Sequence, residues 1–312
     1  MEKHNLYFKY FKSYGLICSL FLIIILYLII CYLKNKEGFE LINDSCDNIT
    51  CDNINNKIIF MSGNNTSYNT IYDKFYTFVY DDISFNNETY NEQGNILKTL
   101  LEPHNLFVQN ILLENIMTGH LYGTITNFPS KITATNLTNS LIIKSKNNYP
   151  SLNIHNYNLL DDNTFNTSQF TCITNFSNSF YYYNFSEINK YFKNIHNFLI
   201  PKGYFVINYI NDFNNCNTLY GSVNKSKRSY LYMNYNYNVL NDNYDDNNIK
   251  IIESISSKLK KNKKRINTHI LYKHTKEKLI HCAKKNNLEL VQNIYKCKYK
   301  MNYGILIFKR MS

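Results

Sequence analysis

The chain has 312 residues, a formal net charge of +11, 29 tyrosines and no tryptophan. This length allows one or two domains and one sizeable hydrophobic core. The charge is uneven, which excludes a uniformly basic chain: from Lys250 onward there are 17 Lys and Arg against 3 Asp and Glu, and before it 17 against 20. The basic character belongs to the C-terminal part, so the overall charge says little about the main domain.

An apolar segment follows a short N-terminal tail, residues 1–14. Gly15–Leu33 is 19 residues long and contains no charged side chain. A helix of this length spans roughly 28 Å, close to the thickness of a bilayer's hydrocarbon core. The alternative, a cleaved signal peptide, usually has an apolar core of about 7–15 residues and ends in small residues, whereas this segment runs into Lys34. We expect a retained transmembrane helix, and the lysines on both sides leave its orientation open.

Residues 34–71 are rich in Asn, Asp, Ser and Thr, and we interpret them as a linker with one short strand near Ile58–Met61. Cys46 and Cys51 lie in this linker and can form a disulfide if their side of the membrane is oxidising. The eight cysteines show no Cys-x2-Cys or His/Cys spacing that indicates zinc. The sequence therefore predicts no metal site.

The hydrophobic pattern changes at Tyr72, where aromatic and apolar residues begin to recur at helical spacing. Further on, short apolar or β-branched runs alternate with segments that can form helices, which is typical of a parallel α/β sheet. The strand candidates are Asn110–Asn115, Ile132–Leu137, Ile154–Asn158, Phe170–Phe176 and Tyr204–Ile210. A helix is predicted at Ser186–Phe198, with Ser186 as its N-cap, and the turn Pro201–Gly203 leads into the last of these strands.

The C-terminal part begins with a low-complexity segment at about residues 212–248, which we expect to be a flexible insertion with an edge strand at Tyr230–Tyr237. A short helix is predicted at Ile249–Leu259, followed by the basic stretch Lys258–Arg265. Thr275 can cap a helix that extends to about Lys285. The remaining candidates are two strands of a terminal hairpin, Leu288–Tyr295 and Gly304–Lys309.

This order of segments resembles the class I S-adenosylmethionine (SAM)-dependent methyltransferases, particularly methyltransferase-like proteins of large DNA viruses. The resemblance covers residues 72–312 and includes the Pro201–Gly203 turn, where Lys202 replaces a glycine of the family's turn. It implies an α/β, Rossmann-like domain with a seven-stranded, mostly parallel sheet and an antiparallel last strand. It also implies that the helices after Tyr72 cap a SAM pocket, where an aromatic residue either touches the ligand or packs in the core.

The resemblance implies which residues contact SAM. The family's acidic-x-Gly-x-Gly-x-Gly loop after the first strand corresponds to Leu113, Asn115, Met117 and Gly119, with Glu114 one place from the acidic position. The acidic residues that end the second and third strands, which bind ribose and adenine, correspond to Asn136 and Asn158. The implied cofactor-binding residues are listed together: Glu114, Asn115, Gly119, Asn136 and Asn158. An amide lacks the charge of a carboxylate, and Met117 places a long side chain where the methionine part of SAM lies in the family.

No catalytic residue can be assigned. The segment Asn175–Tyr183 corresponds to the family's acceptor-orienting region, and methyl transfer often requires only proximity and alignment. His120 follows the loop as a weaker candidate, and motifs of hydrolases, phosphate-binding loops and zinc proteases are absent from the sequence.

Three functions remain open. The first is a membrane-anchored methyltransferase-like protein with reduced or lost SAM-dependent activity and a structural or binding role. The second is an active SAM-dependent methyltransferase with a divergent pocket. The third is a nucleic-acid-associated protein that uses Lys258–Arg265, a stretch that can equally bind anionic lipid. The expected location is a single-pass position in a viral or host internal membrane through Gly15–Leu33, with protein partners conceivable for the first function.

Overall fold

The computed structural model describes residues 61–103, 109–128, 130–213, 234–242, 245–259, 262–295 and 303–312. The predicted transmembrane segment Gly15–Leu33 and the cysteine pair Cys46 and Cys51 lie outside these residues. Within the described ranges, no helix is both long and apolar enough to cross a bilayer.

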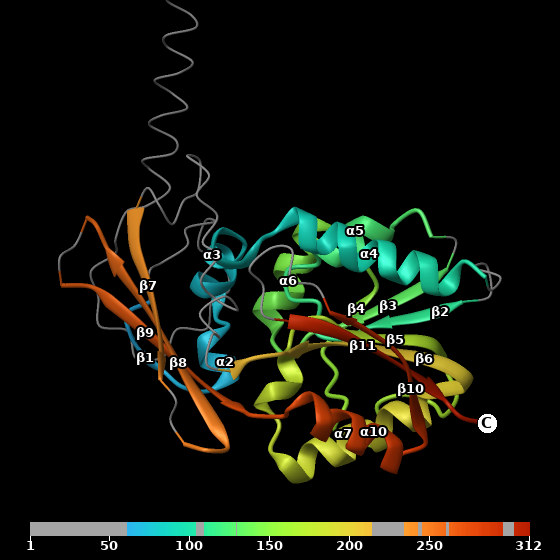
Figure 1. Ribbon diagram of the computed structural model, residues 1–312. Helices are drawn as coiled ribbons and strands as arrows, with labels where there is room; N and C mark the ends of the chain where they lie inside the picture. Colours follow the sequence, from blue (N-terminus) through green and yellow to red (C-terminus); the bar gives the residue numbers. More distant parts are fainter. Residues whose placement is uncertain are drawn as a thin grey trace, which may run out of the picture. The chain divides into compact units, whose positions relative to one another are not determined.

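The described elements form two sheets and the helices that cover them (Figure 1). The helices are α2 (Tyr68–Ile71), α3 (Lys74–Ser84), α4 (Asn87–Leu101), α5 (His120–Ile125), α6 (Asn139–Asn148), the 3-10 turn η2 (Ser179–Tyr182), α7 (Phe185–Phe198) and α10 (Lys276–Lys285). The strands are β1 (Gly63–Asn65), β2 (Asn110–Leu113), β3 (Lys131–Thr135), β4 (Ile154–His155), β5 (Phe170–Asn175), β6 (Leu199–Ile210), β7 (Tyr235–Asp242), β8 (Asn248–Ser257), β9 (Lys264–Tyr272), β10 (Leu288–Tyr295) and β11 (Tyr303–Arg310).

The larger sheet has seven strands in the order β10-β11-β6-β5-β2-β3-β4. Strands β6, β5, β2, β3 and β4 pair in parallel, whereas β11 is antiparallel to both of its neighbours. This arrangement confirms the expected mostly parallel Rossmann-like sheet with an antiparallel last strand. The terminal hairpin and the helix capped by Thr275 are also confirmed.

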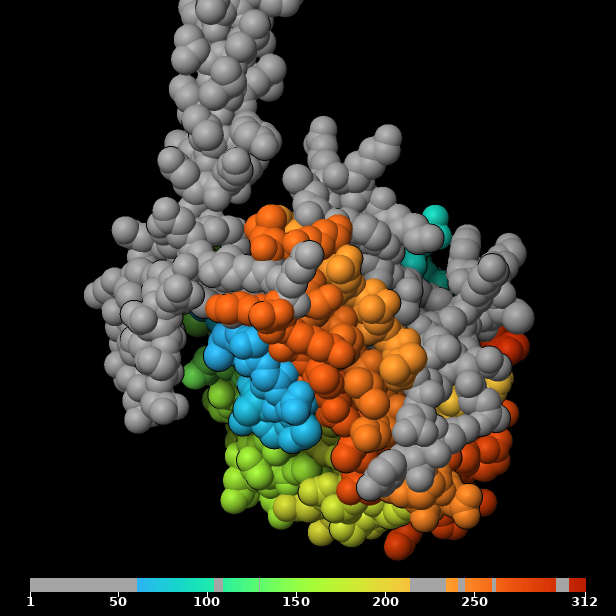
Figure 2. Space-filling view, turned by 90° about the vertical axis from the view of Figure 1, so that its left-hand side faces the viewer, coloured from blue at the N-terminus to red at the C-terminus, as the bar shows by residue number. Residues whose placement is uncertain are grey.

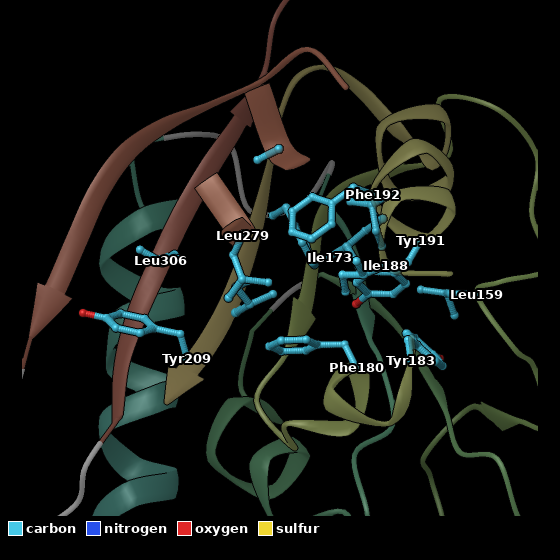
Figure 3. Packing of buried hydrophobic residues seen from close by; sticks show 14 of the residues in the cluster. Leu159, Ile173, Phe180, Tyr183, Ile188, Tyr191, Phe192, Tyr209, Leu279 and Leu306 are labelled. Carbon is cyan, nitrogen blue, oxygen red and sulfur yellow. The ribbon is translucent and has the colours of Figure 1, made fainter. Parts of the chain in front are cut away.

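Hydrophobic cores lie on both faces of this sheet, because parallel strands are covered by helices on both sides. Figure 1 shows α4 and α5 over one face and α7 and α10 over the other. Along β2, Ile111 and Leu113 belong to the first core and Leu112 to the second, as a side-chain period of two requires. Figure 3 shows how Ile188 and Phe192 of α7 lie against Ile173 of β5 in the second core.

Helix α7 begins earlier than expected. Its N-cap is Asn184, whose Oδ1 accepts hydrogen bonds from the backbone N–H groups of Ser186 and Glu187. Glu187 in turn accepts a hydrogen bond from the backbone N–H of Asn184 at 2.8 Å. This reciprocal capping box satisfies more of the free N–H groups of the first turn than a serine alone, so the prediction of Ser186 as the cap is wrong.

The second sheet, with the order β1-β9-β8-β7, was not expected. The predicted helix Ile249–Leu259 is wrong: these residues form most of β8, where buried and half-buried side chains alternate. Glu253 lies on the buried face of this strand, and a charged residue there disguised the period-two pattern in the sequence. The edge strand predicted at Tyr230–Tyr237 is instead β7, which lies within the segment expected to be flexible.

Two buried polar side chains of the second sheet connect it to the N-terminal helices. The guanidinium of Arg265 is bound to the carboxylate of Asp73 at 2.6 Å and to the backbone carbonyls of Thr70 and Ile71. Tyr76 of α3 donates a hydrogen bond of 2.7 Å to Glu253. Figure 2 shows the blue surface of the first described elements beside the orange surface of this sheet. These contacts hold α2 and α3 against the second sheet.

Candidate functional site

The loop between β2 and α5 has an unusual backbone. Asn115, Met117 and Gly119 all have positive φ angles, of 46°, 57° and 91°. The resemblance aligns these alternate positions with the glycines of the family's loop, and glycine is the residue that adopts this conformation most readily. The loop therefore keeps the conformation of a glycine-rich turn although two of the three residues carry side chains, and a methionine in this region is strained.

Asn136, at the end of β3, holds this loop in place. Its Oδ1 accepts a hydrogen bond of 2.9 Å from the backbone N–H of Met117, and its Nδ2 donates one of 2.8 Å to the backbone carbonyl of the same residue. Ser145 of α6 donates a second hydrogen bond to that carbonyl at 2.6 Å. The Asn136 side chain is fully buried. Both the oxygen and the nitrogen of its amide are thus hydrogen-bonded to the loop.

The other side of the loop is covered by the N-terminal helices. The hydroxyl of Tyr68 is within hydrogen-bond distance of Asn115 and 3.8 Å from the sulfur of Met117. Asp81 of α3 accepts a hydrogen bond from Thr118 and lies 3.1 Å from His120 Nε2. Although burial opposes its ionisation, these hydrogen bonds and the nearby positive groups hold the pKa of Asp81 below its usual value. The carboxylate of Asp81 therefore lies next to the N-terminus of α5.

Asn158 lies in the loop after β4, away from these contacts. Its Oδ1 accepts a hydrogen bond of 3.0 Å from the backbone N–H of Leu160, and its carbonyl accepts one of 2.8 Å from Thr164. The side chain is half-buried and stabilises its own turn. Neither Asn158 nor Asn136 lines the cavity described next.

A cavity of about 130 Å³ lies at the carboxyl ends of β2, β5 and β6. Glu114 to Met117 form one wall, Phe176 to Asn178 after β5 form another, and Asn208 of β6 and Tyr303 of β11 complete the base. The remaining wall comes from the N-terminal helices, with Tyr80, Tyr90 and Gln93 among its side chains. Tyr72 also lines the cavity, whereas Phe75, Tyr76 and Val79 pack in the core. Of the two roles expected for the residues of these helices, a place at the pocket therefore applies to Tyr72 and core packing to the other three.

Three residues of this lining each keep a buried side-chain oxygen without a hydrogen-bond partner in the described part of the chain: Gln93 Oε1, Asn178 Oδ1 and Asn208 Oδ1. Gln93 and Asn208 are each only 3% exposed. The orientation of the Asn208 amide is fixed, because its Nδ2 donates a hydrogen bond of 2.8 Å to the carbonyl of Phe176. Buried polar groups are usually paired, but none of these three oxygens is accessible from the cavity, so a ligand there does not contact them in this conformation.

Glu114 is the carboxyl group of this lining. Burial raises its pKa to about 8, although hydrogen bonds from Tyr191 and Asn175 act in the opposite direction. Tyr191 donates its hydroxyl to Glu114 Oε2. At neutral pH the group is therefore mostly protonated, and a cation in the cavity would favour its ionised form.

The structure brings together only some of the residues implied by the sequence. Glu114 and Asn115 line the cavity, whereas Gly119 is the N-cap of α5 and packs against Tyr149. The sequence analysis did not identify Gln93, Asn208 or Tyr303 as site residues. Their positions in the sequence carry no motif, and only the register of β6 against β11 places Asn208 and Tyr303 at the same edge.

Solved structures with the same fold include SAM-dependent methyltransferases. A SAM-dependent methyltransferase from Clostridium acetobutylicum ATCC 824 aligns with 76% of this chain and 98% of its own, with 14% identity and a TM-score of 0.56. The sugar N-methyltransferase KedS8 from Streptoalloteichus sp ATCC 53650 aligns with 88% of this chain and 100% of its own, with 11% identity and a TM-score of 0.52. The amino pentose methyltransferase CalS10 from Micromonospora echinaspora, solved with SAM bound, aligns with 71% and 92%, with 11% identity and a TM-score of 0.50.

No protein-family profile matches the chain, and no curated protein matches it in sequence. At these identities the similarity establishes the fold: an α/β, Rossmann-like methyltransferase fold. SAM is a plausible ligand on the ground that such neighbours bind it.

The resemblance places Asn136 at the ribose of SAM. Its side chain carries no carboxylate, is fully buried and is hydrogen-bonded to Met117, so as it lies it does not offer an exposed acceptor to a ribose hydroxyl. No cluster of His, Cys, Asp and Glu that could hold a metal occurs within the described ranges.

Proposed function

We propose that this chain is a methyltransferase-fold binding protein that has lost SAM-dependent activity, and that its ligand occupies the cavity beside Glu114. The observation that carries this proposal is the state of Asn136. Its acceptor and its donor are both bonded to the backbone of Met117, and its side chain is fully buried. Turning it toward a ribose would leave the backbone N–H of Met117 without this acceptor and would remove one of the two hydrogen bonds to the Met117 carbonyl.

The energetic consequence supports weak SAM binding. A hydrogen bond to a charged group contributes about 1.5–3 kcal/mol, against about 0.5–1.5 kcal/mol for a neutral one. Each loss of about 1.4 kcal/mol weakens an affinity tenfold. Because Asn136 supplies no carboxylate, and breaking its bonds to Met117 adds a further penalty, a micromolar ligand would become a millimolar one.

Isothermal titration of the purified full-length chain with SAM and S-adenosylhomocysteine tests this proposal. We expect no micromolar binding of either compound. The methyltransferase from Clostridium acetobutylicum, titrated in the same buffer and detergent, is the positive control. A micromolar dissociation constant for this chain would contradict the proposal and support an active methyltransferase with a divergent pocket.

Membrane anchoring through Gly15–Leu33 is part of the same proposal, and it rests on the length and the uncharged sequence of that segment. Carbonate extraction of membranes that contain the expressed chain should leave it in the pellet. A variant without residues 15–33 is the control and should enter the soluble fraction. Release of the full-length chain would contradict the anchor. The viral resemblance, the internal-membrane location and the use of protein partners stay predictions.

Binding of nucleic acid or anionic lipid by Lys258–Arg265 also stays a prediction, but the structure restricts which residues can take part. The Arg265 side chain is fully buried and bound to Asp73, so phosphate contacts would rest on the lysines. RNA binding that weakens steeply as salt increases, and that liposomes of anionic lipid do not displace, would favour the nucleic-acid function.

A further inference from the structure

Charge is divided unequally between the helices on the two faces of the larger sheet. Residues 185–198 and 273–286, which comprise α7 and α10 with the ends of α10 and are named the α7–α10 surface, contain seven Lys and two Glu. On the opposite face, α4 and α5 contain one Lys and two Glu. Figure 1 shows the two pairs of helices on opposite sides of the sheet. One side of the domain is therefore strongly basic and the other is not.

The positive charge of the α7–α10 surface is not neutralised within the described part of the protein. Its two carboxylates already have partners: Glu187 caps α7, and Glu277 lies 3.6 Å from Lys276. Four of its lysines are exposed and form no ion pair with any described residue: Lys193, Lys278, Lys284 and Lys285. These ammonium groups remain available to an anionic partner.

An apolar groove of about 350 Å³ lies between the two helices. Phe185 and Ile188 of α7 and Leu279 of α10 are among the side chains that line it. The Phe185 ring is 40% exposed, and the ammonium group of Lys278 lies 4.4 Å from its centroid. Exposed lysines and an apolar groove thus occur on the same surface, which is the combination found where proteins lie on a membrane.

We propose that the α7–α10 surface docks on an anionic lipid membrane, with the lysine ammonium groups at the lipid headgroups and the apolar groove open to an acyl chain. Lysines near an anionic surface are attracted to it over about a Debye length, without a defined binding geometry. This inference goes beyond the proposed function and does not depend on the ligand of the cavity beside Glu114.

The composition of this surface favours lipid over nucleic acid. It contains no arginine, the residue whose planar group pairs with phosphates and bases through two hydrogen bonds. The apolar side chains of the groove offer no hydrogen bonds to a base edge, whereas they can bury an acyl chain. RNA is therefore the competing outcome of the test.

Lysine labelling tests the proposal on the full-length chain. The chain is incubated with nanodiscs of phosphatidylcholine, with or without phosphatidylserine, and treated with an amine-reactive reagent, and the labelled lysines are measured by mass spectrometry. On the anionic discs, Lys278, Lys284 and Lys285 should react at least about fivefold more slowly, because each lysine at such a surface contributes about a fivefold change in affinity.

The internal controls are exposed lysines of α4, β3 and α6, which should react at nearly the same rate on both kinds of disc: Lys98, Lys131 and Lys146. Equal labelling of the α7–α10 surface on both discs, or equal protection of the two sets of lysines, would overturn the inference. Protection by single-stranded RNA, with none by phosphatidylserine, would overturn it in favour of nucleic acid.

A triple variant locates the contact. Lys278→Gln, Lys284→Gln and Lys285→Gln together should weaken the attraction about a hundredfold, so that phosphatidylserine no longer protects Lys193. The matched control carries Lys98→Gln, Lys131→Gln and Lys146→Gln, loses the same charge and should keep this protection. All six positions lie on the surface, and urea unfolding confirms that both variants fold. Unchanged protection of Lys193 in the first variant would contradict the proposed surface.

Carbonate extraction separates this inference from the proposed membrane anchor. A chain that is extracted, but whose α7–α10 surface is protected by added anionic discs, would support the surface and contradict the anchor. A chain that stays in the pellet but shows no protection by phosphatidylserine would overturn the surface and leave the anchor intact.

Discussion

Glu114 and Glu253 are carboxyl groups in two regions of the molecule, and each is buried, with 4% and 0% exposure. Glu253, in the second sheet, accepts hydrogen bonds from Tyr76, Tyr237 and Asn267 and lies 2.9 Å from His269 Nε2. Burial opposes its ionisation, but the charge and the hydrogen bond of His269, with the tyrosine hydroxyls, hold its pKa below the usual value.

Glu114, in the larger sheet, lies at a cavity, and there burial raises its pKa to about 8. Tyr191 and Asn175 donate hydrogen bonds to it, but no positive group acts on it as His269 acts on Glu253. The difference teaches where to look for function in this fold. A buried carboxyl group with a charged partner fastens elements together, whereas one at a cavity without such a partner is a candidate contact for a ligand.

The largest expected effect follows from removing the paired carboxylate. Glu253→Ala leaves two tyrosine hydroxyls, an amide and His269 without their acceptor. Breaking such a buried charged network typically costs about 3–5 kcal/mol, so urea unfolding should show a loss of this size. Glu289→Ala, at an exposed position of β10, is the control and should change stability by less than about 0.5 kcal/mol. A loss below about 1 kcal/mol in Glu253→Ala would mean that the network does not fasten the two regions.

A smaller, pH-dependent effect is expected for Glu114→Gln. The folded-state pKa of about 8 lies above the ordinary value of 4.5. Below pH 4.5 the carboxyl is protonated in both states, and between pH 4.5 and 8 the unfolded chain releases its proton first, so wild-type stability falls as pH rises. The variant lacks this loss and should be more stable than the wild type at pH 9. The gain is at most about 5 kcal/mol, because the difference between 8 and 4.5, at about 1.4 kcal/mol for each pKa unit, sets the upper limit.

Urea unfolding of both proteins at pH 4, 7 and 9 measures this difference. If the two stability curves stay parallel over the whole range, Glu114 is not desolvated in the way that distinguishes it from Glu253.

The smallest effect concerns the loop that closes the ribose position. Asn136→Asp keeps the acceptor for the N–H of Met117 but replaces the donor that binds its carbonyl with an oxygen. We expect a loss of about 1–3 kcal/mol, because a buried oxygen without a donor then faces the Met117 carbonyl, which keeps only its hydrogen bond from Ser145. We expect no gain of SAM binding. Asn158→Asp is the matched control. Asp can accept the same hydrogen bond from the backbone N–H of Leu160, so this variant should leave the free energy of unfolding unchanged.

If Asn136→Asp leaves the free energy of unfolding unchanged and the variant binds SAM, the result would instead indicate a decayed cofactor site. The double variant Asn136→Asp with Met117→Gly extends this trial, since glycine relieves the positive φ of 57° at that position.

Local pattern was sufficient for much of the larger sheet. The runs around Ile111, Ile173 and Phe205 are apolar because parallel strands are buried on both faces, and helix α7 shows its apolar side chains at helical spacing. The predicted strands extended two or three residues beyond β2, β3 and β4, because polar loop residues such as Asn115 and Asn136 can continue a strand pattern. The second sheet escaped prediction because Glu253, Arg265 and Asn267 occupy buried positions on β8 and β9.

The sequence by itself determined the layered α/β fold and the position of the loop after β2, since both follow from hydrophobic periodicity along short segments. Only the tertiary structure decided what the polar side chains do. Asn136 and Asn178 are the same residue type, and they follow β3 and β5 at the same edge of the larger sheet, yet one is fully bonded and the other keeps an unpaired oxygen. The reason is physical: whether a buried amide finds a partner depends on backbone groups brought from distant parts of the chain, and no local pattern encodes that distance.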